Sequence, residues 1–262
     1  MFENVKRNFG FGCMRLPMVD GEVDLAQVNR MVDTFIEAGF NYFDTAHGYI
    51  EGKSEKAVKT CLTSRYPRDS YILANKLSDW FFETEEEVLP LFNQQLEICG
   101  VEYFDFYLFH ALNRISYAKH KRLRTFETVS KLHQEGKVRH IAMSFHDTAD
   151  ILDMILTEQP QIEVVQLQIN YLDYDDPGVQ SKACYDVAVK HGKKVIVMEP
   201  VKGGSLVNLP DDAAAVTAML GEIKVEARFE GGRQDMYLDG EFLGDRIREH
   251  EISHYASAVS AI

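Results

Sequence analysis

Four side chains that could transfer a proton to a carbonyl oxygen lie at or just after the ends of three short apolar runs. Asp44 ends the run "NYFD" and Tyr49 follows it, Lys76 comes near the end of "SYILANKL", and His110 ends "YFDFYLFH". Taken singly, each has an ordinary structural explanation, because tyrosines often pack and lysines often keep only their ammonium in water. Their joint occurrence at three successive runs indicates a site.

These residue types suit the reduction of a carbonyl group. A lysine in a partly dry cavity needs a carboxylate partner, which Asp44 supplies. The cation is expected to lower the pKa of the Tyr49 phenol from its ordinary value of about 10, so that the phenol donates a proton near neutral pH. His110 would hydrogen-bond the carbonyl oxygen and fix its direction. No side chain delivers hydride, so a nicotinamide cofactor is implied.

The elements that must position these residues alternate between residues 22 and 200. Nearly continuous apolar runs separated by helical patterns predict parallel strands buried on both faces. No G-x-G-x-x-G follows the first run, which favours a barrel over an open dinucleotide-binding sheet. In such a barrel the reactive groups lie at the carboxyl ends of the strands. Six strands are expected, at residues 41–46, 70–77, 103–110, 138–145, 163–170 and 193–200.

Helix signals stand between these runs. Asp24 and Gly39 bracket one helix as caps, and Thr84 and Gly100 bracket another. Pro90 lies inside the second pattern, so that helix is expected to kink or to begin later. Further helices are expected within residues 53–66, 123–136, 148–159 and 178–192.

The pattern changes after about Met219. Two strand-like runs parted by Gly231 and Gly232 predict a β-hairpin with a two-residue turn. We therefore expect an incomplete α/β barrel of six βα units over residues 1–219 and an atypical segment over residues 220–262 packed on it. Open sheet edges are unfavourable, so we expect the hairpin within residues 222–244, or a second chain in an oligomer, to cover one.

Seven stretches together resemble the aldo-keto reductase superfamily. They are "FGFGCMRLP", "FDTAHGYIEGKSE", "ILANKL", "FDFYLFHALN", "VRHIAMSFH", "QLQINYLD" and "VIVMEPVKGG", in order over roughly residues 9–207. The chain is most similar to the bacterial and archaeal branch in which many members carry an iron-sulfur segment. The resemblance implies a TIM (β/α)8-type barrel that binds NADPH, or less often NADH, in extended form. It also implies a catalytic tetrad of Asp44, Tyr49, Lys76 and His110.

The same resemblance implies a set of cofactor contacts. Ser144 and Gln166 would hydrogen-bond the nicotinamide carboxamide, and Met198 stands where the family often has an aromatic residue that stacks on the ring. The glycine-containing stretch "PVKGG" would run along the pyrophosphate. The expected cofactor-binding residues are Met14, Arg15, Asp44, Ser144, Gln166, Met198, Val201 and Gly203. The cysteine cluster of the iron-sulfur branch is missing, so no iron-sulfur or other metal centre is expected. Recognisable counterparts of two later barrel strands are also missing.

Composition sets the remaining expectations. The formal net charge of -13 argues against a nucleic-acid partner, and no apolar stretch is long enough for a membrane span. Four scattered cysteines without metal-ligand spacing indicate reduced, buried thiols. Without the apolar region of a secretory signal, a cytoplasmic protein acting on a small carbonyl compound is the expectation.

Two other functions fit parts of the sequence. The first is a metal-dependent hydrolase, which would use the histidines near the strand ends: His47, His110, His140 and His146. Such an enzyme needs converging ligands such as His-x-His on the first strand, and this motif is absent. His140, inside a strand, is expected to pack or hydrogen-bond locally.

The second alternative is a catalytically impaired binding or regulatory protein on the reductase scaffold, or a truncated product that does not bind cofactor.

Overall fold

A computed structural model describes residues 2, 4–204, 206, 225–230, 233–238 and 241–242 of the chain. The chain forms two compact units. The first comprises Met1–Leu167 with Ala183–Ile196, and the second comprises Gln168–Lys182 with Val197–Ile262. All four residues proposed for proton transfer belong to the first unit.

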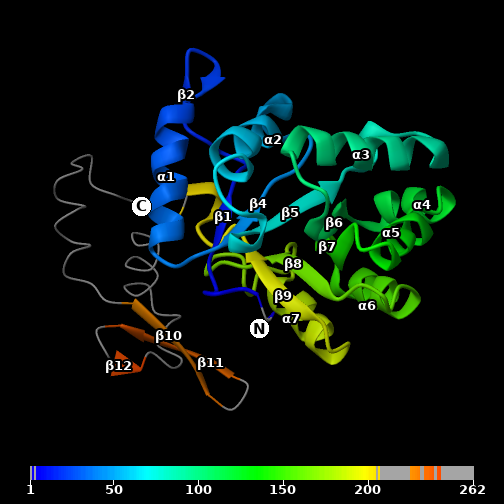
Figure 1. Ribbon diagram of the computed structural model, residues 1–262. Helices are drawn as coiled ribbons and strands as arrows, with labels where there is room; N and C mark the ends of the chain where they lie inside the picture. Colours follow the sequence, from blue (N-terminus) through cyan, green and yellow to red (C-terminus); the bar gives the residue numbers. More distant parts are fainter. Residues whose placement is uncertain are drawn as a thin grey trace. The chain divides into compact units, whose positions relative to one another are not determined.

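A seven-stranded sheet is the main feature of the fold (Figure 1). The strands of this sheet, in spatial order, are β1 (Gly10–Gly12), β4 (Tyr42–Asp44), β5 (Ile72–Leu77), β6 (Phe104–Leu112), β7 (Val138–Phe145), β8 (Val164–Gln168) and β9 (Lys194–Met198). Each of the five strand pairs from β1 through β8 is parallel, and helices separate most of these strands in the sequence, as predicted.

All six expected strands are present, and β1 is a seventh that the sequence did not predict. Its sequence, GFG, is short and glycine-rich, so neither strand propensity nor alternation identifies it. Pairing with β4 determines its conformation, with Gly10 opposite Tyr42. A Cβ atom at Gly10 would lie 2.8 Å from the Tyr42 ring, so only glycine allows this close approach. One of the two edges expected to be open is therefore already paired.

Alternate residues along the strands bury both faces of the sheet. One face carries a cluster that runs across neighbouring strands, with Tyr42 paired to Ile72, and Leu108 paired to Ala142. The residues between them point to the opposite face and are also buried, for example Phe43 and Tyr107. Burial on both faces explains why the strands read as continuous apolar runs.

The predicted helices are present. They are α1 (Leu25–Glu37), α2 (Lys53–Val58), which continues as a π-helix over Lys59–Thr63, α3 (Val88–Cys99), α5 (Thr125–Gln134), α6 (Ala149–Glu158) and α7 (Ser181–Lys190). The Asp24 side chain accepts from the amide of Gln27, Thr84 and Glu87 form a capping box, and Gly100 is left-handed. As expected from Pro90, α3 begins late, after a 3-10 turn over Glu85–Glu87.

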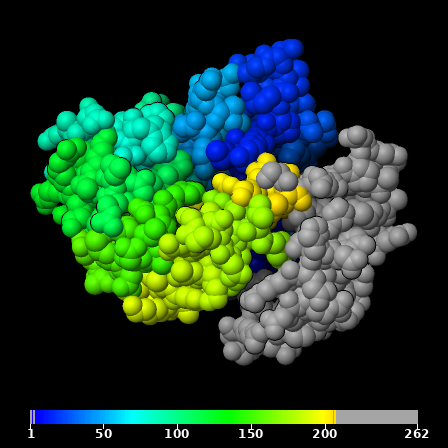
Figure 2. All heavy atoms as spheres, turned by 180° about the vertical axis from the view of Figure 1, so that it is seen from behind, coloured from blue at the N-terminus to red at the C-terminus, as the bar shows by residue number. Residues whose placement is uncertain are grey.

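The sequence did not predict α4 (Arg114–Arg122), because its composition is basic and it lacks a clear apolar face. Its start is set by Asn113, whose side chain accepts from the amides of Ile115 and Ser116. Together α4, α5 and α6 lie along one side of the sheet, and their residues form the continuous green surface of Figure 2.

Two small antiparallel sheets complete the described strands. In the first unit, β2 (Met18–Val19) pairs with β3 (Glu22–Val23). In the second, β10 (Val225–Glu230) pairs with β11 (Arg233–Leu238), with Glu230 opposite Arg233, as predicted for the two strands of the hairpin; the predicted Gly231–Gly232 turn lies outside the described residues. β12 (Glu241–Phe242) adds a third strand, and these three form a sheet of their own. That the hairpin covers a barrel edge stays a prediction.

Across the described part of the chain, no helix has the length and apolar character that crossing a membrane requires.

Candidate active site

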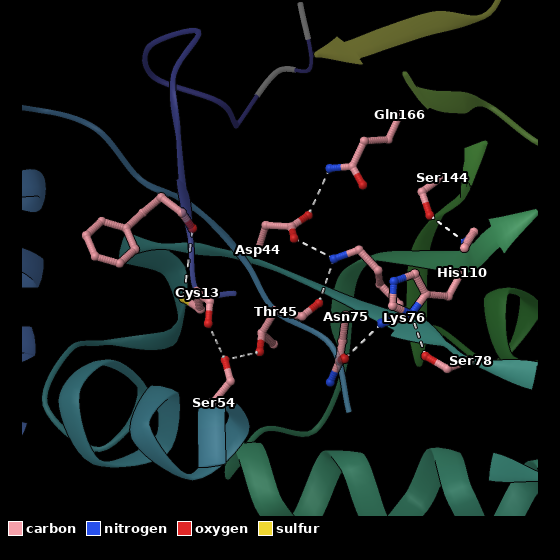
Figure 3. Close-up of polar contacts among 12 residues, drawn as sticks. Cys13, Asp44, Thr45, Ser54, Asn75, Lys76, Ser78, His110, Ser144 and Gln166 are labelled. Carbon is pink, nitrogen blue, oxygen red and sulfur yellow. Dashed lines mark hydrogen bonds and ion pairs between the residues drawn. The ribbon is translucent and has the colours of Figure 1, made fainter. Parts of the chain in front are cut away.

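The side chains proposed for proton transfer lie together at the carboxyl ends of β4, β5 and β6. Lys76 is only 1% exposed, and its Nζ lies 2.5 Å from Oδ1 of Asp44 and 2.9 Å from the carbonyl oxygen of Thr45 (Figure 3). The same nitrogen is 4.7 Å from the centre of the Tyr49 ring. The Tyr49 ring in turn meets the His110 ring edge to face, with 5.8 Å between centres.

The ion pair keeps Lys76 protonated despite its burial. Burial by itself lowers the pKa of a lysine, because it disfavours the charged form. Here the Asp44 carboxylate and the Tyr49 phenol outweigh burial, and the pKa of Lys76 is raised above its ordinary value of 10.5. The site therefore contains a fixed ammonium group at the face of the Tyr49 ring.

The expectation that Lys76 lowers the pKa of Tyr49 was wrong as a net effect. Burial of the phenol raises its pKa, the Lys76 charge lowers it, and the Asp44 carboxylate raises it again. The resulting pKa of Tyr49 lies above the ordinary value of 10 because burial is the largest of these effects. At neutral pH the phenol is therefore protonated, and its proton is available to an acceptor.

Tyr49 begins a strained turn. It is the first residue of the 3-10 segment η1 (Tyr49–Gly52), and its amide donates to the carbonyl oxygen of Ala46 at 3.1 Å. The next three residues all have positive φ: 51° at Ile50, 55° at Glu51 and 80° at Gly52. A β-branched residue in this region is unfavourable, so the surrounding structure must impose the turn.

His110 lies beside an irregularity in β6. The register between β6 and β7 shifts between Phe109 and Leu112, and Ala111 has a φ of 52°. Such bulges redirect side chains at active sites. The ring is neutral: burial, with the Lys76 and His146 charges, lowers the pKa of His110 from 6.5 to about 3.

Two residues support this ring. Ser78 Oγ lies 2.5 Å from the His110 Nδ1 atom. The indole of Trp80, which is 53% exposed, lies 4.9 Å from the imidazole, centre to centre. Sequence reasoning missed both, although each follows Lys76 by no more than four positions and so had to lie near the same strand end.

The two residues expected to bind a carboxamide lie side by side. Ser144 on β7 pairs in register with Gln166 on β8, and both are buried. Gln166 Nε2 donates to Oδ2 of Asp44 at 3.1 Å, and Ser144 Oγ accepts from the amide of Ala111 at 2.8 Å. Within the described residues, the Gln166 oxygen and the Ser144 hydroxyl proton have no recorded hydrogen-bond partner.

The other expected cofactor residues are placed as follows. Met14 and Arg15 follow β1 and are exposed. Met198 ends β9, and Val201 and Gly203 lie in the turn after it; all three belong to the second unit. The roles of these five residues stay predictions.

The loop that holds Val201 and Gly203 is bonded, through Lys202, to a carboxylate that sequence reasoning missed. Asp173 is buried and accepts from Lys202 at 2.6 Å, from Gln168 at 2.6 Å and from Asn170 at 2.8 Å. It ties the segment after β8 to the turn after β9 within the second unit.

A buried polar network lies behind Lys76. Glu55 on α2 is fully buried and accepts from Asn75 at 2.7 Å, and it contacts His47 Nδ1 at 2.7 Å. Gln95 on α3 donates to the carbonyl oxygen of Lys76 and accepts from the hydroxyl of Tyr107. These bonds fix the backbone of β5 next to the lysine. Glu55 belongs to a conspicuous polar stretch, but only the folded chain brings its partners to it.

The remaining histidines and cysteines have local roles. His140 Nδ1 bonds Glu163 at 2.8 Å, as expected for a residue inside a strand. All four cysteines are buried free thiols, which confirms the expectation drawn from their spacing. Burial, together with the Asp44 charge, raises the pKa of the Cys13 thiol, so it is no nucleophile. Among the described residues, no group of three or more metal-ligating side chains is present.

Comparisons with known proteins agree on one family. A sequence model of the Aldo/keto reductase family matches residues 8–234. A 9,11-endoperoxide prostaglandin H2 reductase of Trypanosoma cruzi is 26% identical over 183 residues, which are 69% of this chain and 59% of that protein. This chain spans between 53% and 66% of the length of three such relatives.

Solved structures show the same fold. An aldo-keto reductase from Bacillus halodurans in its holo form gives a TM-score of 0.65 at 24% identity, covering 87% of this chain and 74% of that one. An aldo-keto reductase from Klebsiella pneumoniae in complex with NADPH gives a TM-score of 0.60 at 20% identity, covering 82% of this chain and 72% of that one.

Proposed function

The chain belongs to the aldo/keto reductase family, and from this membership we propose that it reduces an aldehyde or ketone to an alcohol with NADPH or NADH. The observation that carries the proposal is the contact of the Lys76–Asp44 ion pair with the Tyr49 ring, which the His110 ring also contacts edge to face. Three separate strands supply these groups, so their meeting is a property of the fold.

Tyr49 is the proposed proton donor. Its pKa above 10 keeps the phenol protonated in the resting site. When negative charge develops on the carbonyl oxygen, the phenol gives up its proton, and the Lys76 ammonium stabilises the phenolate that remains. Asp44 holds the ammonium in position at 2.5 Å, and neutral His110 can donate a hydrogen bond to the same oxygen without competing as an acid.

The residues on β7 and β8 fit a nicotinamide. Its carboxamide has one acceptor and two donor hydrogens. The Ser144 hydroxyl offers a donor and the Gln166 oxygen an acceptor from neighbouring strands, and neither is used within the described residues. A bound nicotinamide would supply the hydride that no side chain can provide.

Around His110 the surface favours an apolar substituent on the carbonyl compound. Trp80 lies against the imidazole, and Phe81 meets the His47 ring at 4.8 Å. Both rings are more than 40% exposed, so their faces are available to a ligand. We therefore propose an aldehyde or ketone with an aromatic or aliphatic group as substrate.

The test combines binding and turnover. Titration of the chain with NADPH and with NADH, followed by fluorescence, measures cofactor affinity. Consumption of the bound cofactor in the presence of benzaldehyde measures reduction. Replacing Tyr49 by Phe should reduce kcat by a factor on the order of 100 to 10,000 while the dissociation constant for the cofactor stays nearly unchanged.

Three results would reject all or part of this proposal. Unchanged turnover in Tyr49→Phe would exclude the phenol as proton donor. Cofactor binding without reduction of any of a panel of aldehydes and ketones would favour the alternative of a binding or regulatory protein on the reductase scaffold. A chain that binds neither nucleotide would fail as a reductase altogether.

A further inference from the structure

Ser78 uses its hydroxyl group in an unusual way for its position. It follows β5 and stands at the N-cap of the 3-10 segment η4 (Asp79–Phe81), where a serine hydroxyl normally accepts from a backbone amide of the first turn. No such capping bond is formed. The hydroxyl, which is fully buried, instead lies 2.5 Å from Nδ1 of His110.

The direction of this hydrogen bond follows from what each group needs. A neutral imidazole has one N–H donor and one acceptor nitrogen. If Nδ1 carried the proton, it would donate to Ser78, and the buried serine proton would have no acceptor among the described residues. That arrangement is unfavourable. If Ser78 donates to Nδ1, that one bond uses both the serine proton and the acceptor nitrogen of the imidazole.

We propose that Ser78 is a positioning residue that holds His110 in the tautomer with the proton on Nε2, so that Nε2 donates to the carbonyl oxygen of the substrate. This catalytic consequence rests on the proposed function; the tautomer itself does not. The opposite tautomer would present a lone pair to the carbonyl oxygen and repel it.

Two further contacts support this assignment. The His110 ring contacts the rings of Trp80 and Tyr49, with 4.9 Å and 5.8 Å between centres, so packing helps to hold its plane. Burial also keeps the ring from taking a second proton, since the pKa of His110 is about 3.

The tautomer can be measured directly. Long-range proton–nitrogen NMR spectra of the chain labelled at histidine distinguish Nδ1–H from Nε2–H, and the His110 signals are those lost in His110→Asn. We expect Nε2–H in the unmodified chain and in Ser78→Thr, which keeps the hydroxyl. In Ser78→Ala we expect a mixture of the two tautomers.

Kinetics test the consequence. In Ser78→Ala, kcat for aldehyde reduction should fall about 10-fold, while the dissociation constant for NADPH is unchanged, and Ser78→Thr should restore the rate. Thr125→Val is a matched control, because Thr125 makes a similar buried contact of 2.8 Å to Nδ1 of His120. It should change the His120 signals only.

The outcomes separate this inference from the proposed function. Nδ1–H in the unmodified chain, or an unchanged His110 spectrum in Ser78→Ala, overturns the inference. If Ser78→Ala shifts the tautomer but no carbonyl compound is reduced by any form, the assignment of Ser78 stands and the proposed function fails. Should Ser78→Ala not fold, the spectra of the unmodified chain and of Ser78→Thr still decide.

Discussion

At the scale of residues, protonation states define the proposed chemistry. The site combines an ammonium, a protonated phenol and a neutral imidazole. Burial favours the neutral forms of the Tyr49 phenol and the His110 imidazole. The Asp44 carboxylate keeps the Lys76 ammonium charged. A proton donor that stays protonated and a hydrogen-bond donor that does not titrate near neutral pH are suited to carbonyl reduction.

These protonation states predict a flat pH profile. The pKa of His110 is about 3 and that of Tyr49 is above 10, so neither group changes state in between. We expect kcat/KM for reduction to vary little across the neutral range, measured with buffers of constant ionic strength. A change in kcat/KM near pH 6.5 that is absent in His110→Asn would contradict a neutral His110 imidazole with a pKa of about 3.

The ion pair predicts an asymmetric response to substitution. Asp44→Asn leaves the Lys76 ammonium, which is 1% exposed, without its counter-charge, and we expect the free energy of unfolding to fall by about 3 kcal/mol. Adding Lys76→Met should recover part of this loss, because the unpaired charge is then removed. Denaturant unfolding of both variants measures the difference. Equal or greater loss in the double variant would contradict this account.

At the scale of elements, strained and buried polar segments surround the reactive groups. The turn after Tyr49 has three consecutive residues with positive φ, and β6 is irregular next to His110. Behind them, Glu55 and Gln95 join α2 and α3 to β5 through fully buried hydrogen bonds. A satisfied network of this kind holds the strand end rigidly while the strained turns orient the side chains.

The strained turn can be relieved. Glu51 has a φ of 55° and a ψ of 37°, an arrangement that costs a residue with a Cβ roughly 1–2 kcal/mol and glycine much less. Because glycine also loses more entropy on folding, Glu51→Gly should stabilise the chain by about 0.5 kcal/mol in denaturant unfolding.

A glycine in an ordinary helix provides the control. Lys56→Gly, at an exposed position of α2, should destabilise by about 1 kcal/mol. If both variants lose stability equally, the turn is not strained.

At the scale of the whole molecule, two histidines with a lowered pKa couple folding to pH, the fully buried His120 and the partly buried His110. His120 is fully buried, its Nδ1 contacts Thr125, and its Nε2 has no hydrogen-bond partner among the residues that the structure describes. Burial, and secondarily the Lys119 charge, lowers its pKa to about 3, as burial does for His110. Between pH 6.5 and about 3 the unfolded chain therefore binds more protons than the folded chain, and stability falls as the pH falls.

His120→Leu tests this coupling. Each of the two histidines contributes a slope of about 1.4 kcal/mol per pH unit within that window. Removing the imidazole should reduce the slope of the unfolding free energy against pH by about 1.4 kcal/mol per pH unit within that window. Above pH 6.5 the slope should be unchanged. Denaturant unfolding at several pH values provides the measurement. A slope equal to that of the unmodified chain would show that His120 does not titrate on unfolding.

The sequence by itself predicted the strands from β4 to β9, six of the seven α-helices in the described part of the chain and the four residues of the proposed tetrad. It did so because apolar runs, caps and polar strand ends are local signals. It missed β1 and α4, whose sequences, glycine-rich and basic, lack an apolar pattern and depend on pairing or capping for their conformation.

Only the tertiary structure decided the electrostatics of the site. The sequence indicates that Lys76 can meet Tyr49, but the sign of the shift in the phenol's pKa depends on how much water is excluded, and burial prevailed over the cation. The contact of Ser78 with His110 is likewise invisible in a sequence, because it joins residues 32 positions apart through side chains. Burial and long-range contacts are properties of the packed chain, and no local pattern encodes their balance.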